Sequence, residues 1–162
     1  MTEPTDKRVV SQYDDAMAAL AEHAGALPAL CVFAAGAPLD PDGALGVIAA
    51  VEAKGIAARV LAPDAAQQRA LEQSLAAAGR KARVLVADAG GVAELLRGLK
   101  ASTGVALEQA VLFSPDAPAL RDASRAGATA ARLAAGARGP DAAALRRALG
   151  AHASKLLDSR GY

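Results

Sequence analysis

The chain has 162 residues, of which 53% are hydrophobic but only 2% are aromatic, and its formal net charge is +1. This length suits one domain whose core is built from Leu, Val and closely packed Ala. The near-neutral charge gives no attraction to nucleic acid or to an anionic membrane, and no apolar run is long enough to cross a bilayer, so we expect neither as a partner.

The single cysteine, Cys31, excludes an internal disulfide framework. One unpaired cysteine is typical of a reducing compartment, so we expect a cytoplasmic protein. Cys31 lies inside an apolar run, which favours a buried structural thiol over a nucleophile.

The N-terminal segment predicts a loose arm over residues 1–10, followed by one helix. Ser11 and Asp14 form a capping pattern at the start of that helix, and Gly25 ends it. One face of this helix carries an apolar stripe of Tyr13, Met17, Leu20, Ala21 and Ala24. Such a short amphipathic helix must pack either on its own domain or on a second chain.

After this helix the chain alternates regularly between apolar runs and helical patterns. The apolar runs predict buried strands over residues 30–35, 56–62, 82–87, 110–113 and 128–134. Helices follow them, with Asp42, Asp64 and Asp116 as caps and Gly139-Pro140 at the start of the last one. In the last helix, His152 falls on the same stripe as Leu145, Leu149 and Leu156.

This alternation predicts an α/β fold, a Rossmann-like three-layer sandwich with a parallel sheet covered on both faces. We divide the chain into residues 1–28, the arm and extra helix, and residues 29–162, the α/β domain, and treat both as a single structural domain. The loop Ser114-Pro115-Asp116 follows a strand directly, at the carboxyl edge where such sheets bind ligands.

Three segments resemble motifs of one enzyme family. They are CVFAAGAPL at 31–39, GGVAELLRGLKASTGV at 90–105 and VLFSPD at 111–116. They are similar to V-F-D-x-D-x-T-L, G-S-K-x-x-H-F-x-x-L-x-x-x-T-G-V and L-F-F-D-D-E of haloacid-dehalogenase-like (HAD-like) phosphatases, closest to the magnesium-dependent phosphatase-1 type. The resemblance implies a five-stranded parallel sheet in the order 5-4-1-2-3, with strand 30–35 in the centre.

The same resemblance implies that the catalytic groups are missing. The family's nucleophile, general acid, hydroxyl, lysine and magnesium-binding pair fall on Ala34, Gly36, Ala62, Val92 and Ser114-Pro115. Alanine has no atom that can attack phosphorus, Mg²⁺ requires carboxylate oxygens, and phosphoryl transfer depends on charge stabilisation. We therefore expect no Mg²⁺ cofactor and a catalytically silent pseudophosphatase.

A silent member of this fold would act as a binding, accessory or scaffold protein. One candidate is an anionic small ligand at the carboxyl edge, because helix N-termini attract anions. Its binding residues would be Gly36, Ala37, Ser114, Asp116 and Asp88. The other candidate is a protein partner or a second copy of the chain, bound through Tyr13, Met17 and Leu20 of the N-terminal helix.

The alternative is an enzyme of the same fold with reinvented, phosphatase-like hydrolase chemistry or a relocated metal site. Asp40, Asp88 and Asp116 are the carboxylates that could form such a site. We interpret His152 as a partly buried filler rather than a base, and His23 as a surface residue near a helix end.

Overall fold

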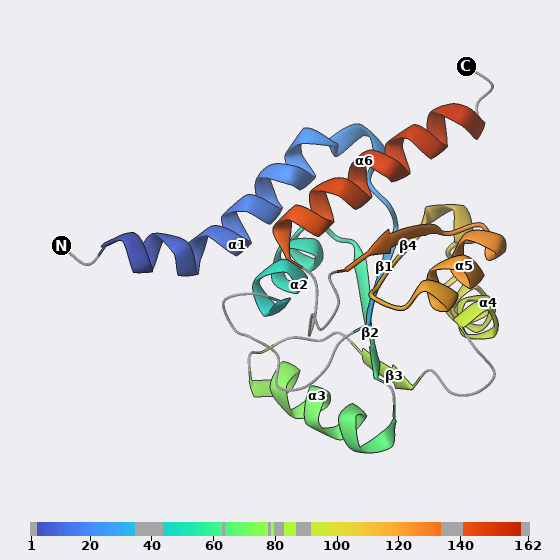
Figure 1. The fold of residues 1–162 in the computed structure, drawn as a ribbon, viewed down its shortest axis with the longest axis horizontal. Helices are drawn as coiled ribbons and strands as arrows, with labels where there is room; N and C mark the ends of the chain where they lie inside the picture. Colours follow the sequence, from blue (N-terminus) through green and yellow to red (C-terminus); the bar gives the residue numbers. More distant parts are fainter. Residues whose placement is uncertain are drawn as a thin grey trace.

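Five strands form one all-parallel sheet in the order β3-β2-β1-β4-β5 (Figure 1). The strands are β1 Leu30–Ala34, β2 Ala57–Ala62, β3 Arg83–Val86, β4 Ala110–Ser114 and β5 Thr129–Arg132. Central strand β1 aligns Leu30 with Ala57 on one side and with Ala110 on the other. The predicted order is confirmed, because 5-4-1-2-3 is the same order read from the opposite edge of the sheet.

The structure, a computed structural model, describes the backbone of residues 3–34, 44–62, 64–77, 79, 83–86, 92–133 and 141–159. Within that set, the side chains left undescribed are those of residues 3–12, 44, 83, 92–93 and 156–159.

Helices cover both faces of the sheet. They are α1 Glu3–Glu22, α2 Ala44–Ala53, α3 Ala65–Ala77, α4 Val92–Thr103, α5 Ala117–Ala126 and α6 Ala142–Ser159, with short 3-10 turns η1 Ala24–Ala26 and η2 Leu107–Gln109. Buried residues of α1, α2, α3 and α6 join the core on one face, and those of α4 and α5 join the core on the other. This is the three-layer arrangement that the alternation predicts.

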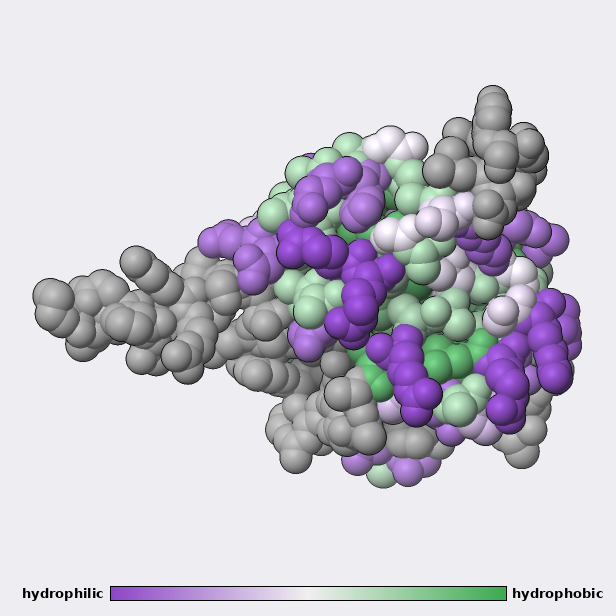
Figure 2. All heavy atoms as spheres, turned by 45° about the horizontal axis from the view of Figure 1, so that its top comes forward, coloured by the Kyte–Doolittle hydropathy of each residue, from purple (hydrophilic) through white to green (hydrophobic). Residues whose placement is uncertain are grey.

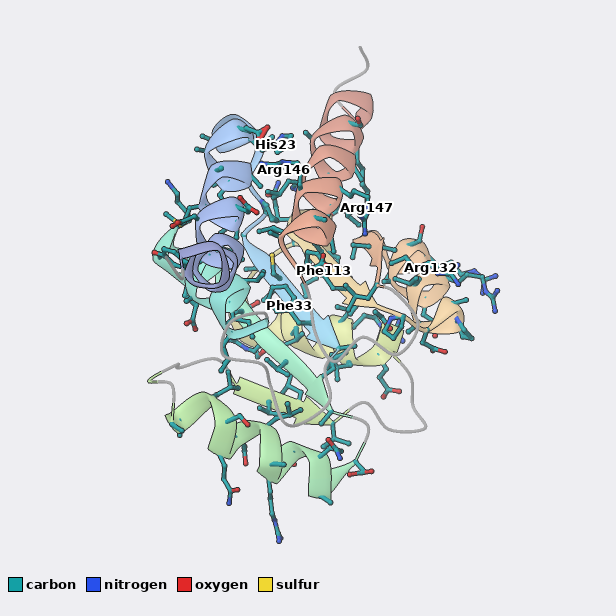
Figure 3. The ribbon with its side chains drawn as sticks, turned by 60° about the vertical axis from the view of Figure 1, so that its left-hand side comes forward. His23, Phe33, Phe113, Arg132, Arg146 and Arg147 are labelled. Atoms are coloured by element: carbon teal, nitrogen blue, oxygen red, sulfur yellow. The ribbon has the colours of Figure 1, made fainter. Side chains whose placement is uncertain are left out.

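Successive residues of a strand contribute in turn to the two layers of the core, because these parallel strands are buried on both faces. Phe33 and Phe113 are aligned neighbours on β1 and β4, and their rings stack with centroids 4.8 Å apart. They lie beside α6 in Figure 3. The rest of the buried core is mostly Leu, Val, Ile and Ala, which confirms the composition-based expectation.

Among the described residues, aspartates cap α3, α5 and α6. Asp64 Oδ1 accepts a hydrogen bond from the Gln67 N–H at 2.8 Å, and Asp116 Oδ2 accepts from the Ala119 N–H at 3.1 Å, so both predicted caps are confirmed. The start predicted for the last helix is wrong. Asp141 caps α6 instead, its Oδ1 accepting from the Ala144 N–H at 2.7 Å, and the first helical residue is Ala142. A side-chain acceptor at this position satisfies a free backbone donor.

The N-terminal helix begins earlier than the sequence predicts. Its backbone is helical from Glu3, so the loose arm expected over residues 1–10 is wrong for residues 3–10. Proline is tolerated in a first helical turn, where Pro4 lies, and acidic side chains such as those of Glu3 and Asp6 favour a helix N-terminus. The helix therefore continues through Ser11, which does not cap it.

The buried stripe of α1 also differs from the predicted one. The buried residues are Ala16, Ala19 and Leu20, whereas Ala21 and Ala24, two members of the predicted stripe, are exposed. The buried residues belong to the core on the α2 and α6 side, and α1 contacts both of these helices. The helix thus packs on neighbouring helices rather than directly on a face or edge of the sheet.

An ion pair also joins α1 to α6. Arg146 Nη2 lies 2.7 Å from Glu22 Oε1, with both side chains about half exposed. Figure 3 shows Arg146 between the two helices and Arg147 on the other side of α6. An exposed pair of this kind contributes at most about 1 kcal/mol, so burial of Leu20 and its alanine neighbours holds the helix in place.

Replacing Gly98 by alanine is expected to stabilise the protein by about 0.5–1 kcal/mol. Gly98 lies on the exposed side of α4, and nothing lies within 4 Å of the Cβ that alanine would add. Chemical denaturation measures the change. The matched control is Gly127→Ala, which must lower stability, because Gly127 ends α5 with a φ of 107° that alanine adopts only with strain. Equal effects at both positions would contradict this account.

Candidate functional site

The carboxyl edge of the sheet brings together the ends of β1, β2 and β4. The strand order reverses between β1 and β4, since β2 and β3 lie to one side of β1 and β4 and β5 lie to the other. In open α/β sheets, ligands bind outside the carboxyl ends of the strands at such a reversal. This edge is therefore the candidate site, as the sequence predicted.

The strand ends at this edge carry little reactive chemistry. Ala34 ends β1 and is partly buried, and Ala62 ends β2 and is buried. Neither methyl group can act as a nucleophile, a proton donor or a metal ligand. The structure therefore places alkyl groups at the two positions where the resemblance implies a phosphorylated aspartate and a hydroxyl.

The end of β4 is polar, but its polar atoms bond to nearby backbone. Ser114 is only 3% exposed, and its Oγ accepts a hydrogen bond from the Asp116 N–H at 3.0 Å. Asp116 caps α5 through the bond to the Ala119 N–H, and Pro115 between them has no side-chain polar atom. The Ser114 carbonyl accepts a bond from the Leu133 N–H at 3.0 Å, which ties this loop to the end of β5.

These contacts weaken the binding of an anion at the start of α5. Two backbone donors at the start of α5, from Asp116 and Ala119, already have acceptors in the chain. The cap is itself a carboxylate, which repels a second negative charge. The N-terminus of α5 is thus less favourable to an anion than an uncapped helix end.

Several predicted site residues lie outside the described part of the chain. They are Gly36, Ala37, Asp40, Asp42 and Asp88. Val92 begins α4, but its side chain is not described. The predicted ligand site is therefore described only at Ser114 and Asp116, and the relocated metal site only at Asp116. Within the described residues, no group of three or more His, Cys, Asp or Glu side chains could hold a metal ion.

The predicted interaction residues of α1 have three different environments. Leu20 is fully buried within the domain, and Met17 is partly buried against the same core. Tyr13 is 39% exposed, the one exposed large hydrophobic residue among the described side chains. Leu20 is thus a core residue, and Tyr13 and Met17 are the ones that a partner could reach.

Cys31 is buried in β1. Burial raises the pKa of its thiol to about 12, so the reactive thiolate is strongly disfavoured. The structure agrees with the interpretation of this residue as a structural thiol.

A polar cluster at the opposite, amino edge of the sheet was missed by the sequence reasoning. His152 of α6 is fully buried, and its Nδ1 lies 3.3 Å from Thr129 Oγ1 of β5. Lys155 donates a hydrogen bond to the Gly127 carbonyl, and its ammonium is attracted by Glu108. Among the described residues, His152 Nε2 has no hydrogen-bond partner. These contacts connect α6 to the start of β5. No pattern in the sequence predicts that Thr129 and His152 are in contact.

Lowering the pH is expected to destabilise the protein through His152. Burial, together with the positive charge of Lys155, lowers the pKa of His152 below its ordinary value of 6.5. Protonation of His152 is therefore less favourable in the folded state than in the unfolded state. The stability associated with neutral His152 is present above pH 6.5 and decreases as the pH falls below that value, by at most about 1.4 kcal/mol per pH unit.

Urea unfolding on both sides of that pH, in wild type and His152→Leu, measures this contribution. The variant removes the titrating group, so its stability must depend less on pH than that of wild type. Carboxylates that titrate at lower pH are common to both proteins and cancel in the difference. Identical pH dependence in the two proteins would contradict the assignment to His152.

No protein-family model matches the chain, and no curated protein is detectably similar to it. Among the described residues, no helix combines the length and apolar character that a membrane crossing requires. The sheet order and the alternating helices define the class as a Rossmann-like parallel α/β protein.

Proposed function

We propose that this chain is a catalytically silent member of the HAD-like α/β phosphatases that acts by binding another protein chain, as an accessory or scaffold protein. The observation that carries the proposal is the chemistry of the carboxyl edge. Ala34 and Ala62 end two adjacent strands, while the Ser114 hydroxyl and the Asp116 carboxylate bond to the local backbone. These residues provide no nucleophile at the end of β1 and no pair of carboxylates after β4.

The same edge disfavours a small anion in the described loop, so we take a protein chain as the proposed ligand. A phosphate or carboxylate bound at the start of α5 would lie beside the Asp116 carboxylate and would find two of the local N–H groups already bonded. Displacing Asp116 from its capping role would cost about 1 kcal/mol before any new bond formed. The missing catalytic carboxylates therefore do not by themselves create an anion site in the described loop.

The distribution of exposed apolar residues favours α1 as the docking element. On the face that Figure 2 shows, strongly hydrophobic residues occupy a small area bordered by hydrophilic ones, and no broad apolar surface is visible. Tyr13 and Met17 lie in the middle of α1, and Figure 1 shows the first half of this helix extending away from the other elements. An extended amphipathic helix is a common means of binding a partner chain.

Hydrolysis of a generic phosphomonoester in the presence of Mg²⁺ tests the catalytic part of the proposal. The expected rate is the uncatalysed background. A rate clearly above background that copurifies with the protein would reject catalytic silence and favour the relocated metal site or a new chemistry.

A further inference from the structure

The two halves of α6 are held to the domain by different kinds of side chain. In the first half, Leu145 and Leu149 are fully buried and belong to the core between the helix and the sheet. In the second half, the described side chains are those of residues 150–155, and none of them is large and apolar. Among them His152 is buried, and Lys155 lies one turn later and is partly buried. Two polar residues thus stand where the first half has leucines.

Both polar residues contact elements at the amino edge of the sheet. His152 Nδ1 lies 3.3 Å from Thr129 Oγ1 at the start of β5. Lys155 donates a hydrogen bond to the Gly127 carbonyl at the end of α5, where a cation is also favoured by the helix dipole. The Lys155 ammonium is attracted by Glu108 of η2. These contacts hold the second half of α6 against the domain.

The surroundings of His152 are unfavourable to its protonated form. The side chain has no exposed surface, and its Nε2 has no hydrogen-bond partner among the described residues. An imidazolium donates from both ring nitrogens, so its Nε2–H would be buried with no described acceptor. The new charge would also lie one helical turn from the Lys155 ammonium, which has the same sign. Protonation therefore weakens the attachment of this part of α6.

The charged groups of α1, β5 and η1, which pack against α6, do not neutralise a protonated His152. Glu22 of α1 is bonded to Arg146 in the first half of α6. Arg132 lies at the carboxyl end of β5 and has the same sign as a protonated histidine. His23, the second histidine of the chain, precedes η1 and therefore requires its own control.

Gly150 separates the two halves of α6. It lies inside the helix, where glycine is less favourable than any residue except proline. Nothing lies within 4 Å of the Cβ that alanine would add, so no close contact requires glycine at this position. Figure 1 shows the C-terminal end of α6 extending past α1. The intrinsically weakest point of the helix thus comes directly before the part that His152 attaches.

We propose that the second half of α6, from Gly150 onward, is an acid-released segment: it detaches from the amino edge of the sheet when His152 takes up a proton. The sheet and the first half of α6 stay folded, because Leu145 and Leu149 do not titrate. The release uncovers Thr129 at the start of β5. This inference goes beyond the proposed function and does not depend on it.

Amide hydrogen exchange tests the release, with rates corrected for their intrinsic dependence on pH. From about pH 7.5 to about pH 5.5, the opening constant of residues 151–155 should rise by up to about tenfold, because opening restores the ordinary pKa of 6.5 to His152. Low concentrations of urea should not change this exchange, because a local opening exposes little surface. Amides of β4 should exchange faster as urea is added. An opening of residues 151–155 that is independent of pH, or as sensitive to urea as that of β4, would overturn the inference.

Variants assign the effect to His152 and to the weak point before it. His152→Leu and His152→Gln both remove the titrating group, so each folded variant should lose the pH dependence, and thermal melting checks folding. The control His23→Gln should keep it. Gly150→Ala should lower the opening constant about fivefold at both pH values and preserve their ratio. PH dependence that persists in the His152 variants or disappears in His23→Gln would overturn the inference, as would a Gly150→Ala protein that opens as readily as wild type.

Discussion

Replacing Leu20 by glutamate is expected to unfold the protein or to lower its stability by at least about 3 kcal/mol. Leu20 has no exposed surface and lies in the core that α1 shares with α2 and α6. The substitution removes a buried apolar side chain and places a carboxylate where no described cation lies buried beside it. A charge buried without a partner is among the most destabilising single changes in a protein.

The matched control is Ala18→Glu, two residues earlier on the exposed side of the same helix. It introduces the same charge and should change stability by no more than about 0.5 kcal/mol. Urea denaturation of both variants gives the comparison. If Leu20→Glu keeps wild-type stability, α1 is not part of the folded domain and its packing on α2 and α6 is wrong.

The burial of Leu20 also determines which substitutions can test docking without unfolding the protein. A double change of Met17 and Leu20 to glutamate would remove a core side chain together with any contact to a partner. Tyr13→Glu separates the two effects, because Tyr13 is exposed and its loss leaves the core unchanged. A folded Tyr13→Glu protein with weakened binding to a partner chain is the outcome expected from the proposed docking role of α1.

The elements that the sequence predicted well depend on local chemistry. The apolar runs that become β1, β2 and β4 are continuous and bounded by turn residues, and a short run between such boundaries is typical of a buried strand. Asp64 and Asp116 bond to N–H groups three residues ahead, so their capping role is visible in a short window. The strand order came from the family resemblance rather than from these patterns.

The phase of α1 could not be predicted because alanine provides little contrast. Ala16 and Ala19 are buried while Ala18 and Ala21 are exposed, although all four have the same side chain. Which alanines face inward depends on where α2 and α6 lie, and that is not encoded within the helix. The contact between Thr129 and His152 was missed for a related reason, since the two residues are 23 positions apart.

At the candidate site, sequence reasoning predicted the edge and an absence of catalytic groups, but not how the remaining groups are used. The capping of α5 by Asp116 was expected, whereas the hydrogen bond from the Asp116 N–H to Ser114 Oγ was not. That bond depends on the tight turn at Pro115. Ser114, which was predicted to bind a ligand, therefore already has a hydrogen-bond partner within the loop.

Catalytic silence predicts that wild-type protein with Mg²⁺ hydrolyses phosphomonoesters no faster than the background reaction. Covalent phosphoryl transfer requires a nucleophile, and Ala34 provides none at the end of β1. Ala34→Asp with Gly36→Asp should remain inactive, because the lysine and the magnesium-binding pair of the resembled family are still absent. Phosphoryl transfer needs these charges as well as an attacking oxygen.

The most direct measurement is Mg²⁺-dependent hydrolysis of p-nitrophenyl phosphate by wild type and by Asp40→Asn, Asp88→Asn and Asp116→Asn, each checked for folding by thermal melting. Catalytic silence predicts background rates for all four proteins. Turnover in wild type that one of the aspartate changes abolishes would contradict catalytic silence and support a relocated metal site. Turnover that survives each of the three changes would contradict both catalytic silence and the relocated metal site. It would require a different chemistry at this edge.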